Sequence, residues 1–470
     1  MNISLPAFNR SALIAIEDIR LQSSLEGATG RLRKARARAL AELPNVEAMR
    51  DKLKVIRSAT LARLADHLET FERNALAAGA HIHWAADGDE ANEIVTRIAR
   101  EHQVTMAAKS KSMATEEIHL NQALLRAGVQ PVETDLGEWI IQLAGEPPSH
   151  IIAPAIHKTR QQVAALFTAE SGRPQSADDI PALTAEARRM LREKFLEAGL
   201  GISGGNIGVA ETGSVVLVTN EGNGRMVSSL PPVYVVVLGI EKIARSWDDA
   251  AVWLALLART ATGQPLSVYT TVVTGPAQPG DPDGPREVHI VLLDNQRSAY
   301  IGTKYEEALQ CIRCGACLNV CPVYREAGGH AYGSPYSGPI GAVISPLLFG
   351  LEDYEALPQA SSLCGACLDV CPVRIDLPRM LLALREDEVD QRVMPYRERF
   401  AERSAAFVLG HERLMRLVSA ILRVLQRPFV RGGGLRLPGR LHPTGQRDLP
   451  SLAPRPFRDI WDELEEKGES

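Results

Sequence analysis

Seven cysteines occur in this 470-residue chain, and all of them lie between residues 311 and 371. The first four follow the pattern Cys-x2-Cys-x2-Cys-x3-Cys-Pro in the stretch 311–322. The other three repeat this pattern in the stretch 361–376, where Ser361 takes the position of Cys311. Thiolates at this spacing bind [4Fe–4S] clusters, and in two-cluster ferredoxins the cysteine before the proline ligates the other cluster. The spacing therefore predicts two neighbouring iron–sulfur clusters.

Exchange of the fourth cysteines assigns every thiolate to a cluster. Cluster 1 is expected to take Cys311, Cys314, Cys317 and Cys371. Cluster 2 is expected to take Cys321, Cys364 and Cys367, with no sulfur at the Ser361 position. Three outcomes are open for its fourth iron: an oxygen ligand from Ser361, water or another group; loss of the iron to leave [3Fe–4S]; or an open Lewis-acid position that binds a ligand. We favour a [4Fe–4S] cluster with a non-cysteine ligand or a labile site on this iron.

A structural zinc scaffold is the main alternative for these cysteines. Zinc sites typically use two Cys-x2-Cys pairs, which supply four ligands, and seven cysteines in the observed pattern fit this poorly. A disulfide framework would spread its cysteines along the chain. The spacer between Cys321 and Cys364 is longer than in compact bacterial ferredoxins, so we expect helices to intervene.

Composition limits the classes of partner. The chain is 45% hydrophobic and 23% charged, with a formal net charge of −5, so no global basic field exists to hold nucleic acid. The basic stretch 31–40 is interpreted as one solvated helix face. No apolar run is long enough for a signal peptide or a transmembrane helix. We therefore expect a cytoplasmic protein with reduced thiols.

The chain is expected to form an α/β protein of several domains. Residues 1–75 have helical periodicity, 76–298 alternate in the α/β manner, 300–390 form a helical two-cluster ferredoxin domain, and 391–470 contain an amphipathic helix and a Pro/Arg-rich tail.

Apolar runs without alternation indicate strands that are covered on both faces, and hence a largely parallel sheet flanked by helices. These runs lie at 214–220, 233–240 and 288–295. Helices are expected at 114–128 and 177–199.

Three polar segments of the α/β region are candidate sites. Lys109 and Lys111 follow a short apolar run and precede a helix, where either an anion site or a serine helix cap is expected. The Gly-rich stretch 201–214 matches no nucleotide-binding motif, so tight turns for close packing are the preferred interpretation. Glu221 follows a strand and is a candidate acyl-transfer nucleophile, although a solvent-facing turn carboxylate is the commoner case.

Histidines and one amphipathic helix complete the candidates. His81 and His83, together with His150 and His157, could gather around a metal or a substrate carboxylate, although most such histidines are ordinary core or surface groups. The stretch 412–431 places leucines, valines and an isoleucine on one helical face and arginines on the other. We favour docking of this helix on a partner or on the protein's own core over peripheral contact with a membrane.

The chain resembles the lactate utilization protein B family over nearly its whole length. The resemblance is carried by "GAHIHWAADGDEA" (79–91), "KSKSMATEEIHLN" (109–121), "VETDLGEWIIQLAGEPPSHIIAPAIHK" (132–158), "AETGSVVLVTNEGNGR" (210–225), "YTTVVTGP" (269–276), "CIRCGACLNVCPVYREAGGHAYG" (311–333) and "RDLPSLAPRPFRDIW" (447–461). The three-cysteine second motif is also similar to the family pattern, so Ser361 is not peculiar to this chain.

This resemblance implies an iron–sulfur subunit that transfers electrons in the oxidation of L-lactate to pyruvate. It implies lactate utilization proteins A and C as partners, together with an electron acceptor that the sequence does not identify. It also implies that 76–298 form a lactate-utilization domain similar in fold to the sugar-isomerase and CoA-transferase superfamily.

Two other functions remain open at the level of sequence. The α/β domain could itself be the catalyst on a 2-hydroxy acid or an acyl substrate, with the clusters serving it. The chain could also be the electron-transfer subunit of a glycolate-type oxidase, although those subunits usually carry paired four-cysteine motifs and lack the "KSKSMATEEIHLN" region.

Overall fold

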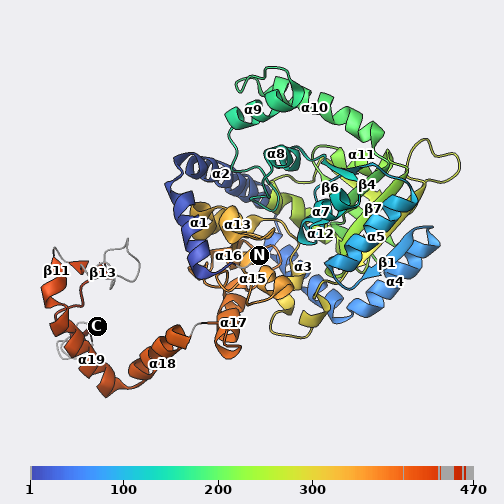
Figure 1. The fold of residues 1–470 in the computed structure, drawn as a ribbon. Coiled ribbons are helices and arrows are strands. Elements are labelled where there is room, and N and C mark those ends of the chain that lie inside the picture. The colour runs from blue at the N-terminus through green and yellow to red at the C-terminus, as the bar shows by residue number, and fades with distance from the viewer. Residues whose placement is uncertain (1–2, 395, 432–433, 436–448, 458–459, 462–470) are drawn as a thin grey trace. The chain divides into compact units, whose positions relative to one another are not determined.

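The computed structural model describes residues 3–394, 396–431, 434–435, 449–457 and 460–461 (Figure 1). The chain divides into two compact units, Met1–Val393 and Met394–Ser470. Most of the predicted Pro/Arg-rich tail lies outside the described residues.

A six-stranded parallel sheet forms the centre of the first unit. Its strands run in the order β1-β10-β7-β4-β2-β3, and every pairing is parallel. Their bounds are β1 His81–Ala85, β2 Met106–Lys109, β3 Gln130–Glu133, β4 Leu200–Gly204, β7 Val233–Gly239 and β10 Glu287–Leu293. All residues of β7 are buried, as expected for a strand covered on both faces. The predicted parallel sheet is therefore confirmed.

A second sheet of four strands has the order β8-β5-β6-β9. Its strands are β5 Ile207–Val209, β6 Ser214–Thr219, β8 Ile243–Ala244 and β9 Tyr269–Val273. The run at 214–220 does not join the parallel sheet, because β6 pairs antiparallel with β5 and β9. Only a short turn separates β5 from β6, and such a connection can join only antiparallel neighbours. The apolar run predicted the strand but not its partners.

Helices cover both faces of the parallel sheet. They are α4 Leu64–Ala77, α5 Gly88–Glu101, α6 Met113–Glu117, α7 Leu120–Arg126, α8 Leu136–Ala144, α9 Arg160–Ser171, α10 Ile180–Glu197 and α11 Asn223–Ser229. The helix α12 Trp247–Ala261 instead packs on β5, β8 and the N-terminal helices. Alternate residues of β7 enter two cores: Val235 and Val237 pack in the core of α5 and α7, whereas Tyr234 packs in the core of α8, α9 and α10. The helix expected at 114–128 is two short helices, separated at His119 with a left-handed φ of 54°.

The N-terminal helices share a core with the cysteine region. The blue helices α1 Leu5–Glu17, α2 Ile19–Ala41 and α3 Val46–Ala62 belong to this part, and α1 and α2 lie beside the orange helices of the cysteine region in Figure 1. Those helices are α13 Ala316–Val320, α14 Pro322–Ala327, α15 Gly338–Phe349, α16 Ala366–Val370 and α17 Leu377–Asp390. Leu25, Leu53, Trp253 and Tyr324 are buried in this one core. The predicted domain boundaries, and the likeness to the sugar-isomerase and CoA-transferase superfamily, stay predictions.

Among the described residues, five short 3₁₀ helices accompany these elements: η1 Ile240–Lys242, η2 Ser298–Tyr300, η3 Glu306–Gln310, η4 His330–Tyr332 and η5 Arg427–Phe429. Of these, η1 follows β7 directly and η3 precedes the first cysteine, so both lie close to the candidate site.

The second unit contains α18 Tyr396–Gly410, α19 Glu412–Leu425 and three two-residue strands, β11 Val430–Arg431, β12 Gly434–Leu435 and β13 Leu449–Pro450. Leu417, Ile421 and Leu425 on α19 are exposed. Within the described parts of the chain, no helix has the length and apolar character needed to cross a bilayer. Docking of α19 on a partner stays a prediction.

Candidate metal centres and the adjoining cavity

The two cysteine motifs repeat in backbone conformation as well as in sequence. Gly315 and Gly365 both have positive φ, at 72° and 82°, and each directly precedes a short helix, α13 or α16. Arg313 and Leu363 are left-handed at 57° and 54°. The helices α13 and α16 contact one another. The sequence duplication is therefore a duplication of fold, with the two loops facing each other.

The first set of thiols surrounds one small, mostly apolar cavity. Cys311, Cys314, Cys317 and Cys371 all line it. Ile340, Val373 and Leu377 supply apolar walls. The crossed assignment requires Cys371 to lie with the first copy's cysteines, and it does so. Ligation by these four residues stays a prediction.

The second set consists of Cys321, Cys364 and Cys367. Burial raises the pKa of Cys367 to about 12, and the neighbouring thiols of Cys321 and Cys364 contribute to this rise. Cys367 also raises the pKa of Cys317, after burial and the first-set thiols, so the two sets are adjacent. Cys364 is exposed, whereas Cys321 and Cys367 are buried. The second set therefore has one thiol at the surface, and no thiol of the first set is exposed.

Ser361 occupies the same local position as Cys311. The backbone N–H of Leu363 donates to Ser361 Oγ at 3.1 Å, and the N–H of Arg313 donates to Cys311 Sγ at 3.4 Å. In both loops, a backbone N–H therefore donates to the side chain two residues earlier in the chain. The loop therefore places an oxygen at the position where the first copy has a sulfur.

The donors fit iron–sulfur clusters. Burial raises the pKa of Cys314 to about 12 and that of Cys371 to about 11, so these buried thiols would ionise near neutral pH only beside a cationic metal centre. All seven cysteines are free. Backbone N–H groups of Tyr324 and Ile375 donate to the sulfurs of Cys321 and Cys371 at 3.5 Å and 3.4 Å, as is typical around such clusters.

Cationic side chains from distant segments reach the backbone of the cysteine loops. Arg50 donates to the carbonyl of Cys371 at 2.8 Å, and Lys242 donates to that of Cys311 at 2.6 Å. Arg36 donates to the carbonyl of Val370 at 2.8 Å. The interpretation of 31–40 as a wholly solvated face is therefore wrong at Arg36, because its guanidinium satisfies a carbonyl of the second cysteine motif.

A chain of buried charges links the parallel sheet to the first cysteine motif. Arg297 donates two hydrogen bonds of 2.8 Å to Glu117 and one of 2.6 Å to Glu241. The three side chains are at most 2% exposed. Burial alone would raise the pKa of Glu241, but Arg297, Lys242 and Arg313 lower it to about 2. The contact between Arg297 and Glu241 is therefore an ion pair over the physiological pH range.

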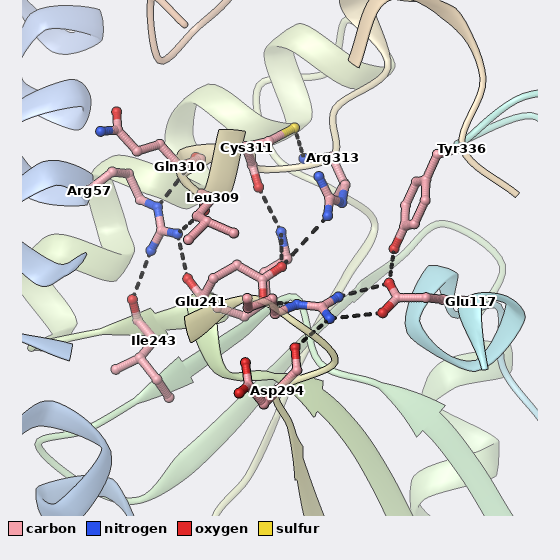
Figure 2. Close-up of polar contacts among 12 residues, drawn as sticks. Arg57, Glu117, Glu241, Ile243, Asp294, Leu309, Gln310, Cys311, Arg313 and Tyr336 are labelled. Atoms are coloured by element: carbon pink, nitrogen blue, oxygen red, sulfur yellow. Dashed lines mark hydrogen bonds and ion pairs between the residues drawn. The ribbon is translucent and has the colours of Figure 1, made fainter. Parts of the chain in front are cut away.

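Further contacts extend this chain to both sides. Tyr336 donates to Glu117 at 2.7 Å, and the guanidinium of Arg313 lies over the Tyr336 ring at 4.7 Å (Figure 2). Arg57 of α3 donates to the carbonyls of Glu241, Ile243 and Leu309. An N-terminal helix, the end of β7 and the segment before Cys311 are thereby held together.

A cavity of about 950 Å³ lies at the carboxyl ends of β2, β4 and β7. This is the edge at which parallel α/β sheets commonly bind ligands. Lys111 and Glu221 line it, as does the Gly-rich turn at Gly204. Ile312 and Arg313 line both this cavity and the cavity of the first cysteine set. These two residues are therefore a shared wall.

The predicted candidates of the α/β region divide into structural and cavity-facing groups. Lys109 is fully buried and bonds Glu133 at 2.5 Å and Glu116 at 2.9 Å, so its charge is already neutralised. Ser112 caps α6 by accepting the N–H of Thr115, as the helix-cap interpretation predicts. Lys111 alone of the two lysines lines the cavity, where it lies 3.3 Å from Glu138.

Glycine in the 201–214 stretch allows close packing. A Cβ on Gly204 would lie 2.4 Å from Ser112 Oγ, and one on Gly205 would lie 2.6 Å from Leu238. This agrees with the tight-packing interpretation.

Glu221, the candidate nucleophile, accepts the backbone N–H of Leu136 at 2.9 Å. The side chain of Glu221 is exposed in the cavity. Partial burial by the cavity walls, followed by the nearby carboxylate of Asp135, raises the pKa of Glu221 to about 7. Its role as a nucleophile stays a prediction.

The four predicted histidines do not form one cluster. His81 and His83 stack on or bond to His289, and His157 bonds Glu146 at 2.7 Å. Both nitrogens of the buried His150 are engaged: Nδ1 accepts two backbone N–H groups at 3.1 and 3.2 Å, and Nε2 lies 3.3 Å from Asn319 Oδ1. His150 is therefore a structural residue.

The sequence analysis missed His289, Arg297, Arg313 and Arg57. Each contacts partners that are far away in the chain, and no local spacing signals those contacts. Of these four residues, only Arg313 lies within a recognisable sequence pattern, which is the first cysteine motif.

Comparisons with known proteins agree with this geometry. A family model described as the LUD domain matches residues 68–293, and one described as a 4Fe-4S dicluster domain matches residues 307–375. A relative from Shouchella clausii, named Lactate utilization protein B, is 41% identical and covers 100% of this chain and 99% of its own. Relatives with the same name are 42% identical in Bacillus subtilis, covering 99% and 98%, and 44% identical in Exiguobacterium sp., covering 94% of each chain.

We predict that Arg297→Met lowers the free energy of unfolding by about 3–5 kcal/mol, because it leaves Glu117 and Glu241 buried without their shared cation. The thermal midpoint of anaerobically purified protein measures this loss. Arg63→Ala is the control, since its exposed pair with Asp66 is expected to contribute less than about 1 kcal/mol. Equal midpoints for the Arg297 and Arg63 variants would contradict the central role of Arg297.

We predict that His150 makes the fold acid-sensitive. Burial, with a smaller contribution from Lys111, lowers the pKa of His150 to about 3, so the unfolded chain binds a proton below pH 6.5 that the folded chain does not bind. Stability is therefore lost as pH falls through 6.5, by at most about 1.4 kcal/mol per pH unit. His150→Gln should reduce this slope, measured by thermal midpoints between pH 8 and 5.5.

The control for this experiment is His119→Asn, which replaces an exposed imidazole at a left-handed position that asparagine tolerates. The control should keep the wild-type slope. A wild-type slope in the His150 variant as well would show that another group causes the acid sensitivity.

Proposed function

Because the chain belongs to the lactate utilization protein B family, we propose that it is an iron–sulfur electron-transfer component of L-lactate utilization. The observation that carries this proposal is the grouping of the cysteines. Four thiols surround one cavity, and three lie together beside it, in the arrangement that crossed ligation of two clusters requires. Seven thiols in two adjacent sets are poorly explained by structural zinc.

We propose Cys311, Cys314, Cys317 and Cys371 as ligands of cluster 1, and Cys321, Cys364 and Cys367 as ligands of cluster 2. Ser361 Oγ is the proposed oxygen ligand of the remaining iron, because it has the backbone contact that Cys311 Sγ has in the first copy. When bound, such clusters supply one-electron transfer, so the pair would carry the two electrons that oxidation of L-lactate to pyruvate releases.

The protein's own residues give the two sets different roles. Ile340, Val373 and Leu377 keep water from the first set. Cys364 is exposed, so the second set lies where a redox partner can approach. Lactate utilization proteins A and C are the partners we propose, on the basis of the family, and the final electron acceptor would be reached through one of them.

We predict about eight irons and eight acid-labile sulfides in anaerobically purified protein. On mild oxidation, the wild type should lose about one iron and develop a [3Fe–4S] EPR signal, because an oxygen ligand holds iron less firmly than a thiolate does. Ser361→Cys should retain this iron, measured by iron content and EPR after oxidation.

The control is Ser176→Cys, which adds a thiol at an exposed position between α9 and α10. It should lose iron as the wild type does. Equal protection by both variants would contradict the assignment of Ser361, and zinc without labile sulfide would contradict the iron–sulfur function.

We propose a second activity for the α/β region, which is binding of the 2-hydroxy acid itself. The supporting observation is the shared wall: Ile312 and Arg313 separate the large cavity from the first thiol set, so a substrate there would lie next to an electron acceptor. Lys111 brings a positive charge to the cavity that suits a carboxylate.

We predict that L-lactate or pyruvate binds the anaerobic holoprotein and that Lys111→Met weakens binding by about tenfold or more, as expected for loss of a charge-assisted bond. Isothermal titration calorimetry measures the dissociation constants. Lys52→Met, on the exposed face of α3, is the matched control and should bind as the wild type does. Absence of binding to iron-replete wild type would remove this second activity and leave the electron-transfer proposal intact.

A further inference from the structure

Four side chains gather on one face of the parallel sheet, at the amino ends of β1 and β10. Residues alternate between the faces of a strand, so His81 and His83 of β1 point to the same side. Glu287 and His289 of β10 do the same, and His81 is directly paired with His289 in the register. This end of the strands is opposite to the edge that forms the large cavity, so the group is separate from the candidate site described above.

The distances between these groups match those within a metal site. His289 Nε2 lies 3.4 Å from Glu287 Oε2, and His102 Nε2, at the end of α5, lies 3.3 Å from the same oxygen. Ligand atoms of His81, Glu287 and His289 all lie within 4.8 Å of one another. In a tetrahedral zinc site with bonds of about 2.0–2.1 Å, neighbouring ligand atoms are about 3.3–3.4 Å apart.

One imidazole has a nitrogen available to a metal. His289 Nδ1 lies 3.0 Å from His83 Nε2. When His83 accepts this hydrogen bond, the proton is on His289 Nδ1 and the Nε2 lone pair is free. His289 Nε2 is buried, lies 3.4 Å from Glu287 Oε2 and makes no hydrogen bond with a described residue.

We propose that His81, Glu287 and His289 bind a divalent transition-metal ion such as Zn²⁺, with water at the fourth position. Two imidazoles and a carboxylate are a donor set that zinc prefers. The ion would join β1, at the edge of the sheet, to β10. His83 is a positioning residue that fixes the His289 tautomer.

A second group of similar composition does not have these properties. Glu146, His157 and His330 also lie within reach of one another, but Lys158 Nζ lies 2.5 Å from Glu146 and supplies the positive charge that a metal would bring. His330 Nε2 is 2.9 Å from the carbonyl of Pro147. This group therefore serves as a matched negative control.

The test uses the iron-replete, anaerobically purified full chain, dialysed against micromolar ZnCl₂, with zinc and iron measured in the same sample. Wild type should retain one zinc per chain, and zinc should raise its thermal midpoint. His81→Ala and Glu287→Gln, both at partly or fully exposed side chains, should each lower zinc affinity by at least tenfold and remove the thermal shift, at unchanged iron content. His330→Gln should behave as the wild type does.

Two results would overturn the proposal. One is that iron-replete wild type retains no zinc. The other is that the His81→Ala and Glu287→Gln variants both retain as much zinc as the wild type does. Having two variants in different strands guards against a folding defect in one of them. Zinc uptake that occurs only as iron is lost would locate the zinc at the cysteines and would also count against the site.

Discussion

Arg297 is buried between Glu117 and Glu241 and binds both carboxylates. The rest of the structure depends on this interaction. Glu117 ends α6, Glu241 lies in η1 after β7, and Arg297 follows β10. Charges this deeply buried are tolerated only when their partners are held in place, so the three segments have fixed relative positions. The carboxyl edge of the parallel sheet is thereby fixed.

This fixed edge positions the first cysteine motif. Lys242, next to Glu241, holds the carbonyl of Cys311, while Arg313 lies between Glu241 and the Tyr336 ring. The loop that carries the first thiols is therefore attached to the sheet by charges rather than by apolar packing alone. As a result, the large cavity and the first cysteine set share a wall, although the motifs that form them are far apart in the sequence.

The second cysteine motif has the same backbone but a different environment. It is held by Arg36 and Arg50 of the N-terminal helices, which bond carbonyls of its α16 segment and of Cys371. Cys364 is exposed and the loop carries an oxygen at Ser361. The duplicated loops therefore differ in two respects: only the second has an exposed thiol, and only the second has an oxygen in place of its first sulfur.

Local patterns predicted those features that depend on neighbouring residues. The cysteine spacing, the buried strands at 233–240 and 288–295 and the capping role of Ser112 all follow from short-range chemistry. Partners across long separations could not be predicted in this way. His83 and His289 are 206 residues apart, and no local pattern joins them or identifies Arg57 as a bridge between three segments.

The pattern of errors has a physical cause. Lys109 and Lys111 look equivalent in the sequence, but Lys109 is the last residue of β2 and is buried beside Glu133, whereas Lys111 lies beyond the end of the strand and lines the cavity. The arginine of 31–40 that reaches the second motif was indistinguishable from its solvated neighbours, because helical periodicity gives a direction but not a partner. The sequence therefore predicted the helices, the strands and the type of metal ligand. Which charged residues contact the cysteine loops depends on tertiary contacts that the sequence does not show.

The measurement that tests the central claim most directly is EPR of the dithionite-reduced, anaerobically purified full chain. Two adjacent thiol sets that both hold clusters predict a spectrum broadened by coupling between two neighbouring paramagnets, with iron and sulfide in equal amounts. A single sharp signal of an isolated cluster, or a silent sample that contains zinc without sulfide, would contradict the account.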